Sequence, residues 1–371
     1  MISITLAIVG LALLIYRLWP RAQRPLPTLA SWPRVSIIIP ARDEEKNLPP
    51  LLQSLTQLDY PNFETIVVND NSTDGTAAIA RSFQGLVIDG QKRPADWFGK
   101  PWACHQGSLI ATGDFLLFTD ADTVHRPESL KIAMAALIDR RASGLTALPF
   151  HQNPALWERL MGPFQLLLTA LTNPYGRPEQ GRVFAIGQYL LFPRSFYDLI
   201  GGHERIKAEA IEDIALARQT LAAGGLWHVH TGVSLYEVHM YETLMDFIKG
   251  WRRNFRGGMK HSSHLSSLEV VLFFMAMTIG TDGRSLSLAI SVLTLTLLAL
   301  TQGKLGRFSI GGILLLPFSM TIFTLVSALA AYDTLFARPL LWKNRRYDAA
   351  GSPAYGKKNA SHSEVTVSDP R

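Results

Sequence analysis

The sequence contains a single cysteine, Cys104, so it can form no internal disulfide and carries no cysteine-rich zinc module. It is also short of charge: Asp, Glu, Lys and Arg make up 18% of its 371 residues, against about 25% in a typical soluble protein. Hydrophobic residues reach 47%, which rules out a disordered chain because such a composition buries enough surface to offset chain entropy. The shortage of charge therefore indicates a soluble part joined to a very apolar one.

Two phosphate-binding motifs are missing as well. The first predicted strand runs into PARDE (40–44) instead of a glycine-rich turn, and no Walker sequence occurs, so neither a dinucleotide-binding fold nor a phosphate-loop ATPase is supported. The stretch DNSTDG (70–75) starts like a calcium loop, but Arg81 stands where a bidentate Glu is needed, which excludes calcium. The net charge of +6 is weak evidence for nucleic-acid binding in a chain of this length, and we expect no nucleic-acid partner.

The N terminus is one source of the missing charge. Residues 2–19 form an apolar run of about bilayer length, followed by Arg21 and Arg24. A signal peptide would have a basic start and a small-x-small cleavage site, and this segment has neither. We expect residues 1–20 to form an uncleaved transmembrane anchor, whose basic flank keeps the following domain in the cytoplasm.

The C-terminal third repeats the apolar signal. Leu286–Leu300 and Ile310–Ala331 are long apolar stretches separated by a short turn with two glycines. They predict a transmembrane helical hairpin over 285–332. The basic tail behind it, 333–371, is predicted to be partly disordered.

The segment before this hairpin is shorter. The apolar part of 268–280 would rise only about 20 Å as a helix, short of the roughly 30 Å hydrocarbon core. Lys and Arg cluster before it in 249–260 and again in 338–346, and if both flanks are cytoplasmic an even number of crossings lies between them. We therefore predict that 257–284 is interfacial or re-entrant. The alternative is a third crossing, which would put the basic tail outside.

Between the apolar ends, short β-branched runs alternate with helical ones. The predicted strands are Val35–Ile39, Glu64–Val68, Leu86–Ile88 and Phe115–Phe118. The predicted helices are Glu44–Leu58, Thr76–Phe83 and Trp102–Ala111. This alternation predicts an α/β domain over 34–256, with a mostly parallel sheet and helices on both faces. Ligands of such sheets bind beyond the carboxyl ends of the strands.

Two acidic residues follow the last of these strands. Asp120 and Asp122 come directly after the apolar run FLLF, and alternate residues of an extended chain point the same way, so the two carboxylates converge. Hard oxygen ligands at a strand end suit Mg²⁺ or Mn²⁺ held between the protein and a diphosphate. A bare Asp-x-Asp fits a solvated turn equally well. His228, His230 and His239 show no metal spacing and are expected to be structural.

Four segments occur together and in a characteristic order. They are VSIIIPARDEE (35–45), VVNDNSTDGT (67–76), TGDFLLFTDADT (112–123) and AIEDIALA (210–217). With them the chain resembles glycosyltransferase family 2 over roughly 34–256. The resemblance implies an inverting enzyme with the nucleotide-diphospho-sugar transferase fold called GT-A, here flanked by transmembrane helices.

In that family the first segment and the acidic residue after the second strand hold the donor nucleoside. By position these are Pro40, Ala41, Asp43, Glu44 and Asp70. Carboxylates suit the role because a uracil N3–H and a ribose diol both need acceptors, so a UDP-sugar is the expected donor. An alternative role for Asp43 is helix capping, which is the favoured interpretation for Asp74.

The resemblance also makes Glu212 and Asp213 the catalytic acids, with Asp213 as the general base. Inverting transfer needs a carboxylate that takes the proton of the acceptor hydroxyl while its oxygen attacks the anomeric carbon. A cation at Asp122 would neutralise the leaving diphosphate. Without the resemblance, the two acids would simply open the helix 212–222, where they interact favourably with its dipole.

One branch of the family matches further. WFGKPWA (97–103) resembles a stretch of membrane-bound members that glycosylate carotenoids or are associated with hopanoid synthesis, and 187–206 and 340–347 resemble the same branch. Lys100 is expected to bind the nucleotide or diphosphate as a point charge, the alternative being an ordinary surface lysine at a helix start. Gly202 and His203 are expected to line the acceptor site, His203 as a polar contact.

Processive polysaccharide synthases of the family carry Gln-x-x-Arg-Trp after the base. Here the region reads KGWRRNF (249–255), and no Gln precedes the Arg at that spacing, which disfavours chain extension. Arg252 and Arg253 are expected to clamp the diphosphate, with Trp251 at the acceptor. Contact with phospholipid headgroups is an equal alternative for this patch.

The sequence thus predicts an integral protein of the bacterial cell membrane with a cytoplasmic catalytic domain. It would transfer one sugar from a nucleotide-diphospho-sugar to a hydroxyl of an apolar lipid, such as a carotenoid, with Mg²⁺ or Mn²⁺. The alternatives are transfer to a polyprenyl phosphate or a glycolipid, and a non-catalytic membrane scaffold.

Overall fold

The computed structural model describes residues 2–19, 25–83, 85–179, 182–209, 211–259, 264–279, 283–336, 338, 340–342 and 345–347. The predicted disorder near the end of the tail lies outside the described residues.

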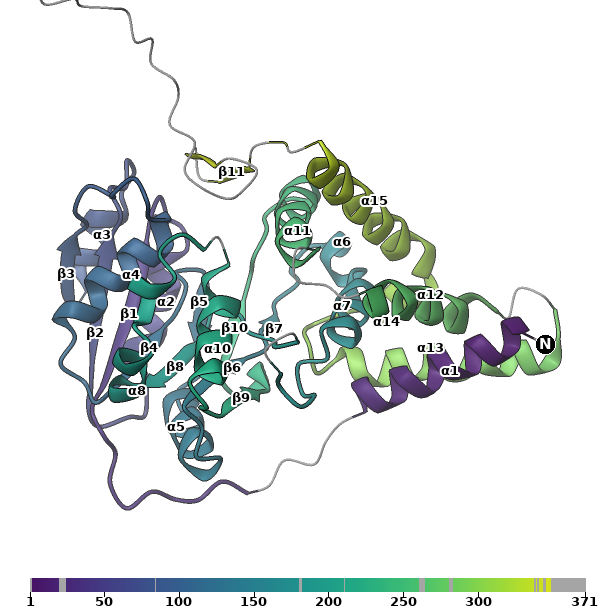
Figure 1. The fold of residues 1–371 in the computed structure, drawn as a ribbon, viewed down its shortest axis with the longest axis horizontal. Helices are drawn as coiled ribbons and strands as arrows, with labels where there is room; N and C mark the ends of the chain where they lie inside the picture. The colour runs from purple at the N-terminus through teal and green to yellow at the C-terminus, as the bar shows by residue number, and fades with distance from the viewer. Residues whose placement is uncertain are drawn as a thin grey trace, which may run out of the picture.

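A seven-stranded sheet forms the centre of the α/β domain (Figure 1). Its strands are β1 (Val35–Ala41), β2 (Phe63–Asn69), β3 (Leu86–Asp89), β4 (Phe115–Phe118), β6 (Gly144–Ala147), β8 (Leu190–Pro193) and β9 (Trp227–His230). They lie in the order β3-β2-β1-β4-β8-β6-β9, and all run parallel except β8, which is antiparallel to both neighbours. The predicted strands and the mostly parallel sheet are confirmed.

Helices cover both faces of this sheet, as predicted. On one face α2 (Leu48–Thr56) and α5 (Ser129–Asp139) pack over alternate residues of β1 such as Ile37 and Ile39, and on the other α4 (Gly99–Ile110) and α10 (Glu212–Ala222) pack over Ile38. All three isoleucines are fully buried, and each such side chain contributes about 1.5–3 kcal/mol of hydrophobic stabilisation. The continuous apolar run of β1 therefore reflects a strand buried on both sides.

Two helices begin at other residues than predicted. α2 starts at Leu48 and not at Glu44. Two prolines occupy its first turn, and because proline has a fixed φ and no N–H, the helix begins beside them and does not extend back toward Glu44. α4 starts at Gly99, three residues early, which places Lys100 in its first turn. In α3 (Thr76–Ser82) the N-cap position is Gly75, and Asp74, one residue before it, accepts the Thr76 N–H on its Oδ1 at 3.0 Å, so its carboxylate satisfies a donor of the first turn.

A small sheet lies between the large sheet and the apolar helices (Figure 1). It contains β5 (Thr123–His125), β10 (Tyr236–Val238) and β7 (Phe150–His151), with β10 antiparallel to β5 and parallel to β7. The connecting helices are α6 (Leu156–Arg159), α7 (Gly162–Thr172), α8 (Arg194–Leu199), α9 (Gly202–Arg205) and the 3₁₀ turn Gly232–Ser234. The small sheet thus links the acidic end of β4 to the helical part of the molecule.

Three apolar helices lie side by side at the end of the molecule away from the large sheet (Figure 1). They are α1 (Ile2–Leu18), α12 (His264–Thr278) and α13 (Ser285–Gln302). The Arg17 guanidinium donates to both oxygens of Glu269 at 2.5 and 2.9 Å, and Gly10 lies against the Leu272 carbonyl group, so α1 and α12 run antiparallel. The absence of a side chain at Gly10 is what permits this close approach of the two helices, since a Cβ there would lie 2.1 Å from the Leu272 carbonyl oxygen.

The last apolar stretch differs from the predicted single helix. It is divided at Leu315 into α14 (Ile310–Leu314) and α15 (Leu316–Leu335), because Pro317 has no N–H to donate and would clash with the carbonyl of residue 313. α15 does not run along α13 as a hairpin partner. It packs on α11 (Leu244–Met259) and α7, while α13 packs on α1, α12 and α7.

By length and composition, α13 and α15 are the described helices that could cross a membrane, and α1 and Leu268–Thr278 are shorter apolar helices. Close to the end of the described chain, β11 (Leu340–Trp342) and β12 (Arg345–Tyr347) form an antiparallel pair.

Candidate active site

Acidic and basic side chains from three elements meet beyond the carboxyl end of β4. Asp120 follows β4, Lys100 lies in the first turn of α4, and Glu212 begins α10. The Lys100 ammonium lies 2.6 Å from Asp120 Oδ1 and 2.8 Å from Glu212 Oε1. The structure therefore joins the predicted metal-binding strand end to the predicted catalytic acids through one lysine.

Lys100 is an interior residue, with 19% of its side chain exposed. Burial alone would lower the pKa of its ammonium, but Asp120 and Glu212 outweigh burial and hold the pKa well above its usual value. A permanently charged group so placed can hold a diphosphate. The alternative of an ordinary surface lysine does not describe this environment.

Gly187 provides the space that the lysine needs. A Cβ atom at this position would lie 2.4 Å from Lys100 Nζ and 2.8 Å from Glu212 Oε1. The Gly187 N–H also donates to Asp213 Oδ2 at 2.8 Å. A residue without a side chain thus orients the predicted base and leaves room for the ion pair beside it.

Asp213 is held in place at the start of α10. Its two carboxylate oxygens accept the N–H groups of Gly187 and of Ile214, the latter at 2.7 Å. Burial, and then the neighbouring Glu212 charge, raise the pKa of the Asp213 carboxyl to about 7. A carboxylate with that pKa is a far better proton acceptor than an exposed aspartate, and it is still largely ionised at pH 8.

Asp122 has the properties expected of a cation ligand. Its Oδ1 is buried and has no hydrogen-bond partner among the described residues. Burial, with the charges of Asp120 and Glu44, raises the pKa of the Asp122 carboxyl to about 7. Within the described ranges no three His, Cys, Asp or Glu side chains gather as a metal cage. Two carboxylates fit an ion that takes its other ligands from phosphate oxygens and water.

The predicted nucleoside residues lie at the same edge of the sheet, at the ends of β1 and β2. The register pairs Ala41 with Asn69, and the Asp70 N–H donates to the Ala41 carbonyl oxygen at 2.8 Å. Asp43 has a φ of 51°, and its carboxylate accepts the Thr73 N–H at 2.8 Å. This bond joins the loop after β1 to the loop after β2. Asp43 does not cap α2, whose N-cap residue is Asn47. Pro40, Glu44 and Asp70 complete the group predicted for the nucleoside.

The domain built around this site matches a known family. Residues 36–199 match the model described as glycosyl transferase family 2. The α/β domain is a glycosyl transferase family 2 domain. Two curated relatives are the 4,4'-diaponeurosporenoate glycosyltransferases of Staphylococcus haemolyticus (strain JCSC1435) and Staphylococcus aureus (strain MRSA252). They are 27% and 28% identical to this chain, and each alignment covers 84% of this chain and 88% of the relative.

A solved structure confirms the GT-A fold of this domain. A mannosyltransferase from Pyrobaculum calidifontis, in complex with GDP-Man and Mn²⁺, superposes with a TM-score of 0.53 at 17% identity. The alignment covers 91% of this chain and 99% of the mannosyltransferase. The predictions of the family, of the likeness to carotenoid glycosyltransferases and of the fold are therefore confirmed.

Two residues predicted to line the acceptor site lie in the interior of the family 2 domain. His203 is 1% exposed, packs edge-on against Phe118, and has its Nδ1 2.7 Å from the Tyr197 hydroxyl. Gly202 is buried against the same tyrosine, where a Cβ would meet the ring at 2.5 Å. The local GGH sequence therefore reflects tight packing around Tyr197.

The three residues of the predicted patch on α11 have different surroundings. Trp251 packs into an aromatic cluster with Phe164. Arg252 pairs with Asp333 of α15, with both bonds at 2.5 Å. Burial raises the pKa of the Tyr241 phenol to about 12, with Arg253 opposing and Asp122 adding to that shift, so both charged groups lie within electrostatic reach of this phenol.

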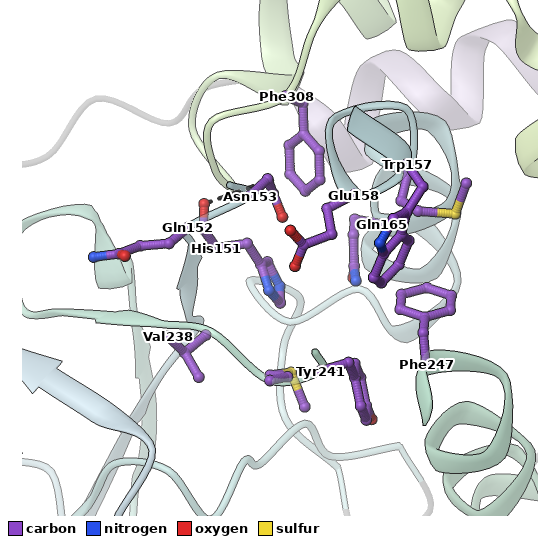
Figure 2. A pocket seen from close by; sticks show the side chains of 12 residues that line it. His151, Gln152, Asn153, Trp157, Glu158, Gln165, Val238, Tyr241, Phe247 and Phe308 are labelled. Carbon is purple, nitrogen blue, oxygen red and sulfur yellow. Dashed lines mark hydrogen bonds between the residues drawn. The ribbon is translucent and has the colours of Figure 1, made fainter. Parts of the chain in front are cut away.

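A recess that no motif indicates opens beside this site (Figure 2). It is open to solvent and is lined from the small sheet, from α6 and α7, and from α11. Figure 2 shows the Glu158 carboxylate pointing into the recess toward His151, with Phe308 on the side of Glu158 away from His151. The lining residues come from segments far apart in the sequence, so no local pattern reveals them.

The raised pKa of Asp213 predicts the pH dependence of the reaction. If Asp213 is the base, it must be ionised in the free enzyme, so kcat/KM should fall about tenfold per pH unit below about 7. An exposed aspartate would keep the rate constant down to about pH 4. The measurement is the pH profile of kcat/KM at saturating Mn²⁺. A profile that is flat between about pH 5 and 7 would contradict this role.

Proposed function

We propose that this protein transfers one sugar from a nucleotide-diphospho-sugar to an apolar isoprenoid lipid, such as a carotenoid, at the cytoplasmic face of a bacterial membrane. The observation that carries the proposal is the meeting of Lys100 with Asp120 and Glu212, next to a base-like Asp213. The relatives named for a carotenoid acceptor support the class of acceptor. The apolar helices beside the domain support delivery of the acceptor from a membrane.

The donor is proposed to be a UDP-sugar that lies along the carboxyl ends of β1, β2 and β4. Pro40, Ala41, Asp43, Glu44 and Asp70 would hold the nucleoside, and Lys100 and Arg253 the diphosphate. Asp122, with Asp120, would hold Mg²⁺ or Mn²⁺, in agreement with the buried, unpartnered Asp122 oxygen and with the Mn²⁺ in the mannosyltransferase complex. The cation, when bound, supplies positive charge to the leaving diphosphate.

Asp213 would act on the acceptor. Its carboxylate removes the proton of the acceptor hydroxyl as that oxygen forms a bond to the anomeric carbon, and the bond from this carbon to the diphosphate oxygen breaks. Attack opposite the leaving group inverts the anomeric configuration. The two backbone N–H groups on Asp213 orient the carboxylate, and Glu212 keeps Lys100 close to where the diphosphate charge develops.

The test is expression of the full chain in a pigment-producing bacterial host, with mass analysis of the extracted lipids. We expect a carotenoid or related isoprenoid to gain the mass of one hexose or deoxyhexose, and no gain with the Asp122→Asn variant. A sugar found on polyprenyl phosphate or on a glycolipid would move the acceptor to that class. No sugar gain in any lipid, together with no nucleotide-sugar binding by the purified protein, would contradict the proposal.

We also propose that α12 and α13 form the membrane hairpin, in place of α13 and α15; the 15 residues of α12 rise only about 22 Å, so the bilayer must thin beside this helix. α12 runs antiparallel along α1, and after α13 the chain returns to the catalytic domain, where Gly306 pairs with His151. Two crossings by α12 and α13 keep the basic flanks on one side, as charge parity requires. α15 would then lie along α11, held by the ion pair between Arg252 and Asp333.

Cysteine labelling tests this topology, because the one native cysteine is buried. In intact cells a membrane-impermeant maleimide should label Ser285→Cys, at the exposed start of α13. It should label Ser82→Cys, exposed on α3, only after permeabilisation. A reporter fused after Arg346 should be cytoplasmic. Protection of Ser285→Cys in intact cells, or an external reporter, would contradict the arrangement.

A further inference from the structure

The recess of Figure 2 lies close to the reacting groups. Val238, which lines it, pairs with Thr123, the residue directly after Asp122, and on its other side with His151. Neighbouring strands are about 4.8 Å apart, so two strand spacings place the recess within roughly 10 Å of Asp122. Tyr241, another lining residue, is within electrostatic reach of Asp122. A molecule in the recess could therefore extend one end to the transfer site.

One wall of the recess is apolar and continuous with the membrane-side helices. Trp157, Met161, Phe247 and Phe308 line it. The same side chains belong to the hydrophobic cluster that includes buried residues of α1, α12, α13 and α15. The apolar wall of the recess is therefore part of the same packed cluster as the membrane-side helices, which places the recess next to an apolar part of the molecule.

The polar feature of the recess is an interior carboxylate. Glu158 has 8% of its side chain exposed; its Oε1 lies 2.9 Å from His239 Nε2, and its Oε2 accepts the Ala155 N–H at 2.7 Å. This second bond caps α6, which explains the position of the side chain but does not require its negative charge. A carboxylate that lines an apolar site repels an anionic ligand.

No lysine or arginine is among the described residues that line the recess. The arginines on adjoining segments have partners of their own. Arg159 donates to the backbone carbonyl oxygen of the lining residue Asn153 at 3.0 Å, and Arg307 lies 3.6 Å from Glu237. Burial lowers the pKa of the His151 imidazole to about 4, so this lining residue is neutral. The lining residues themselves thus offer an anionic ligand no opposite charge, and Arg253, which acts electrostatically on Tyr241, lies outside the lining.

We infer that this recess is the acceptor-binding site and that Glu158 restricts it to neutral, hydroxyl-bearing isoprenoids by excluding carboxylates. The inference rests on the proposed function and makes it more specific. It separates this chain from the relatives named for 4,4'-diaponeurosporenoate, which is a carboxylate. It also agrees with the need for a base, because a hydroxyl must lose a proton during transfer whereas a carboxylate has none to lose.

Retinol and retinoate test the inference, because they share one isoprenoid skeleton and end in a hydroxyl and a carboxylate. Binding to the purified full-length protein is measured by quenching of tryptophan fluorescence at about pH 8, where imidazole is neutral. Wild type should bind retinol at least about tenfold more tightly than retinoate. Glu158→Gln, which keeps the cap on α6, should tighten retinoate binding about 10- to 100-fold and change retinol binding less than about threefold, as expected for removal of a like charge a few ångströms away.

The matched control is Glu242→Gln. Glu242 is an ion-paired acid like Glu158, but its side chain is 65% exposed, and its partner at 3.2 Å is Lys46. This variant should bind both ligands as wild type does. A gain of retinoate affinity in Glu158→Gln cannot result from misfolding, since a damaged site loses binding.

Three results would overturn the inference: equal wild-type affinities for retinol and retinoate, no binding of retinol, or no gain of retinoate affinity in Glu158→Gln. Mn²⁺-dependent UDP binding is measured in parallel on the same samples. If UDP binds while the recess results fail, the proposed glycosyl transfer stands and the acceptor site lies elsewhere. If the recess discriminates as expected but UDP does not bind, the donor part of the proposed function fails.

Discussion

Replacing Asp122 by Asn is expected to reduce sugar transfer by about 1,000-fold or more, because a cation on the leaving diphosphate contributes several kcal/mol to transition-state stabilisation. The buried Oδ1 of Asp122 has no hydrogen-bond partner among the described residues, so the structure offers no other use for this charge. An asparagine amide has the same shape but is neutral. Initial rates over a Mn²⁺ titration, with Mn²⁺-dependent UDP binding by calorimetry, measure the effect.

The same substitution should stabilise the fold in the absence of metal. Removal of a buried charge, one oxygen of which has no hydrogen-bond partner among the described residues, relieves a desolvation cost, so the thermal midpoint of metal-free Asp122→Asn should rise above that of wild type at pH 8. Loss of activity with a gain of stability separates a ligand from a structural residue. Asp89→Asn is the control, since Asp89 ends β3 on the surface and pairs with Arg81 at 2.6 Å. A wild-type rate for Asp122→Asn at saturating Mn²⁺ would contradict the metal site.

The strands, and the edge where the site lies, could be predicted from the sequence because their signals are local. A β-branched run such as VSIII identifies a strand buried on both faces, and the acids directly after FLLF must then lie at the end of β4. Parallel neighbours bring the loops after β1, β2 and β4 to one edge. This accounts for Asp120, Asp122 and Asp70 without any knowledge of side-chain contacts.

The ion pair of Lys100 with Glu212 could not be predicted in this way. The two residues are far apart in the sequence, and their contact depends on how α4 and α10 pack on the sheet and on the missing side chain of Gly187. The recess is non-local for the same reason, since Glu158, Tyr241 and Phe308 meet only after the small sheet and the apolar helices have packed together.

The α11 patch shows why adjacency in sequence is a poor guide on a helix. Successive residues turn by about 100° around a helix axis, so neighbours point to different surroundings. Trp251 enters the aromatic cluster, Arg252 reaches Asp333, and Arg253 remains on the side of Tyr241. Of the three residues predicted to act together, Arg253 is the one that shares electrostatic reach of Tyr241 with Asp122, which agrees with the proposed role at the diphosphate.

Replacing Asp213 by Asn is expected to lower kcat by about 100- to 10,000-fold, the usual contribution of a positioned general base. Because Asp213 contacts no predicted nucleoside or metal residue, UDP binding in the presence of Mn²⁺ should stay within about threefold of wild type. Asparagine can accept only one of the two N–H bonds that Asp213 receives, so some loss of stability, about 1–3 kcal/mol, accompanies the loss of the base.

The pH profile separates these two effects of the Asp213→Asn substitution. A base with a pKa of about 7 gives wild type an acidic limb, and removal of that base leaves a slow reaction whose kcat/KM no longer falls between about pH 7 and 5. A variant that is merely less stable keeps the fall of kcat/KM between about pH 7 and 5 and has a lower kcat/KM at every pH. A wild-type kcat in Asp213→Asn would transfer the role to Glu212, which could serve as base only by giving up its 2.8 Å contact with Lys100.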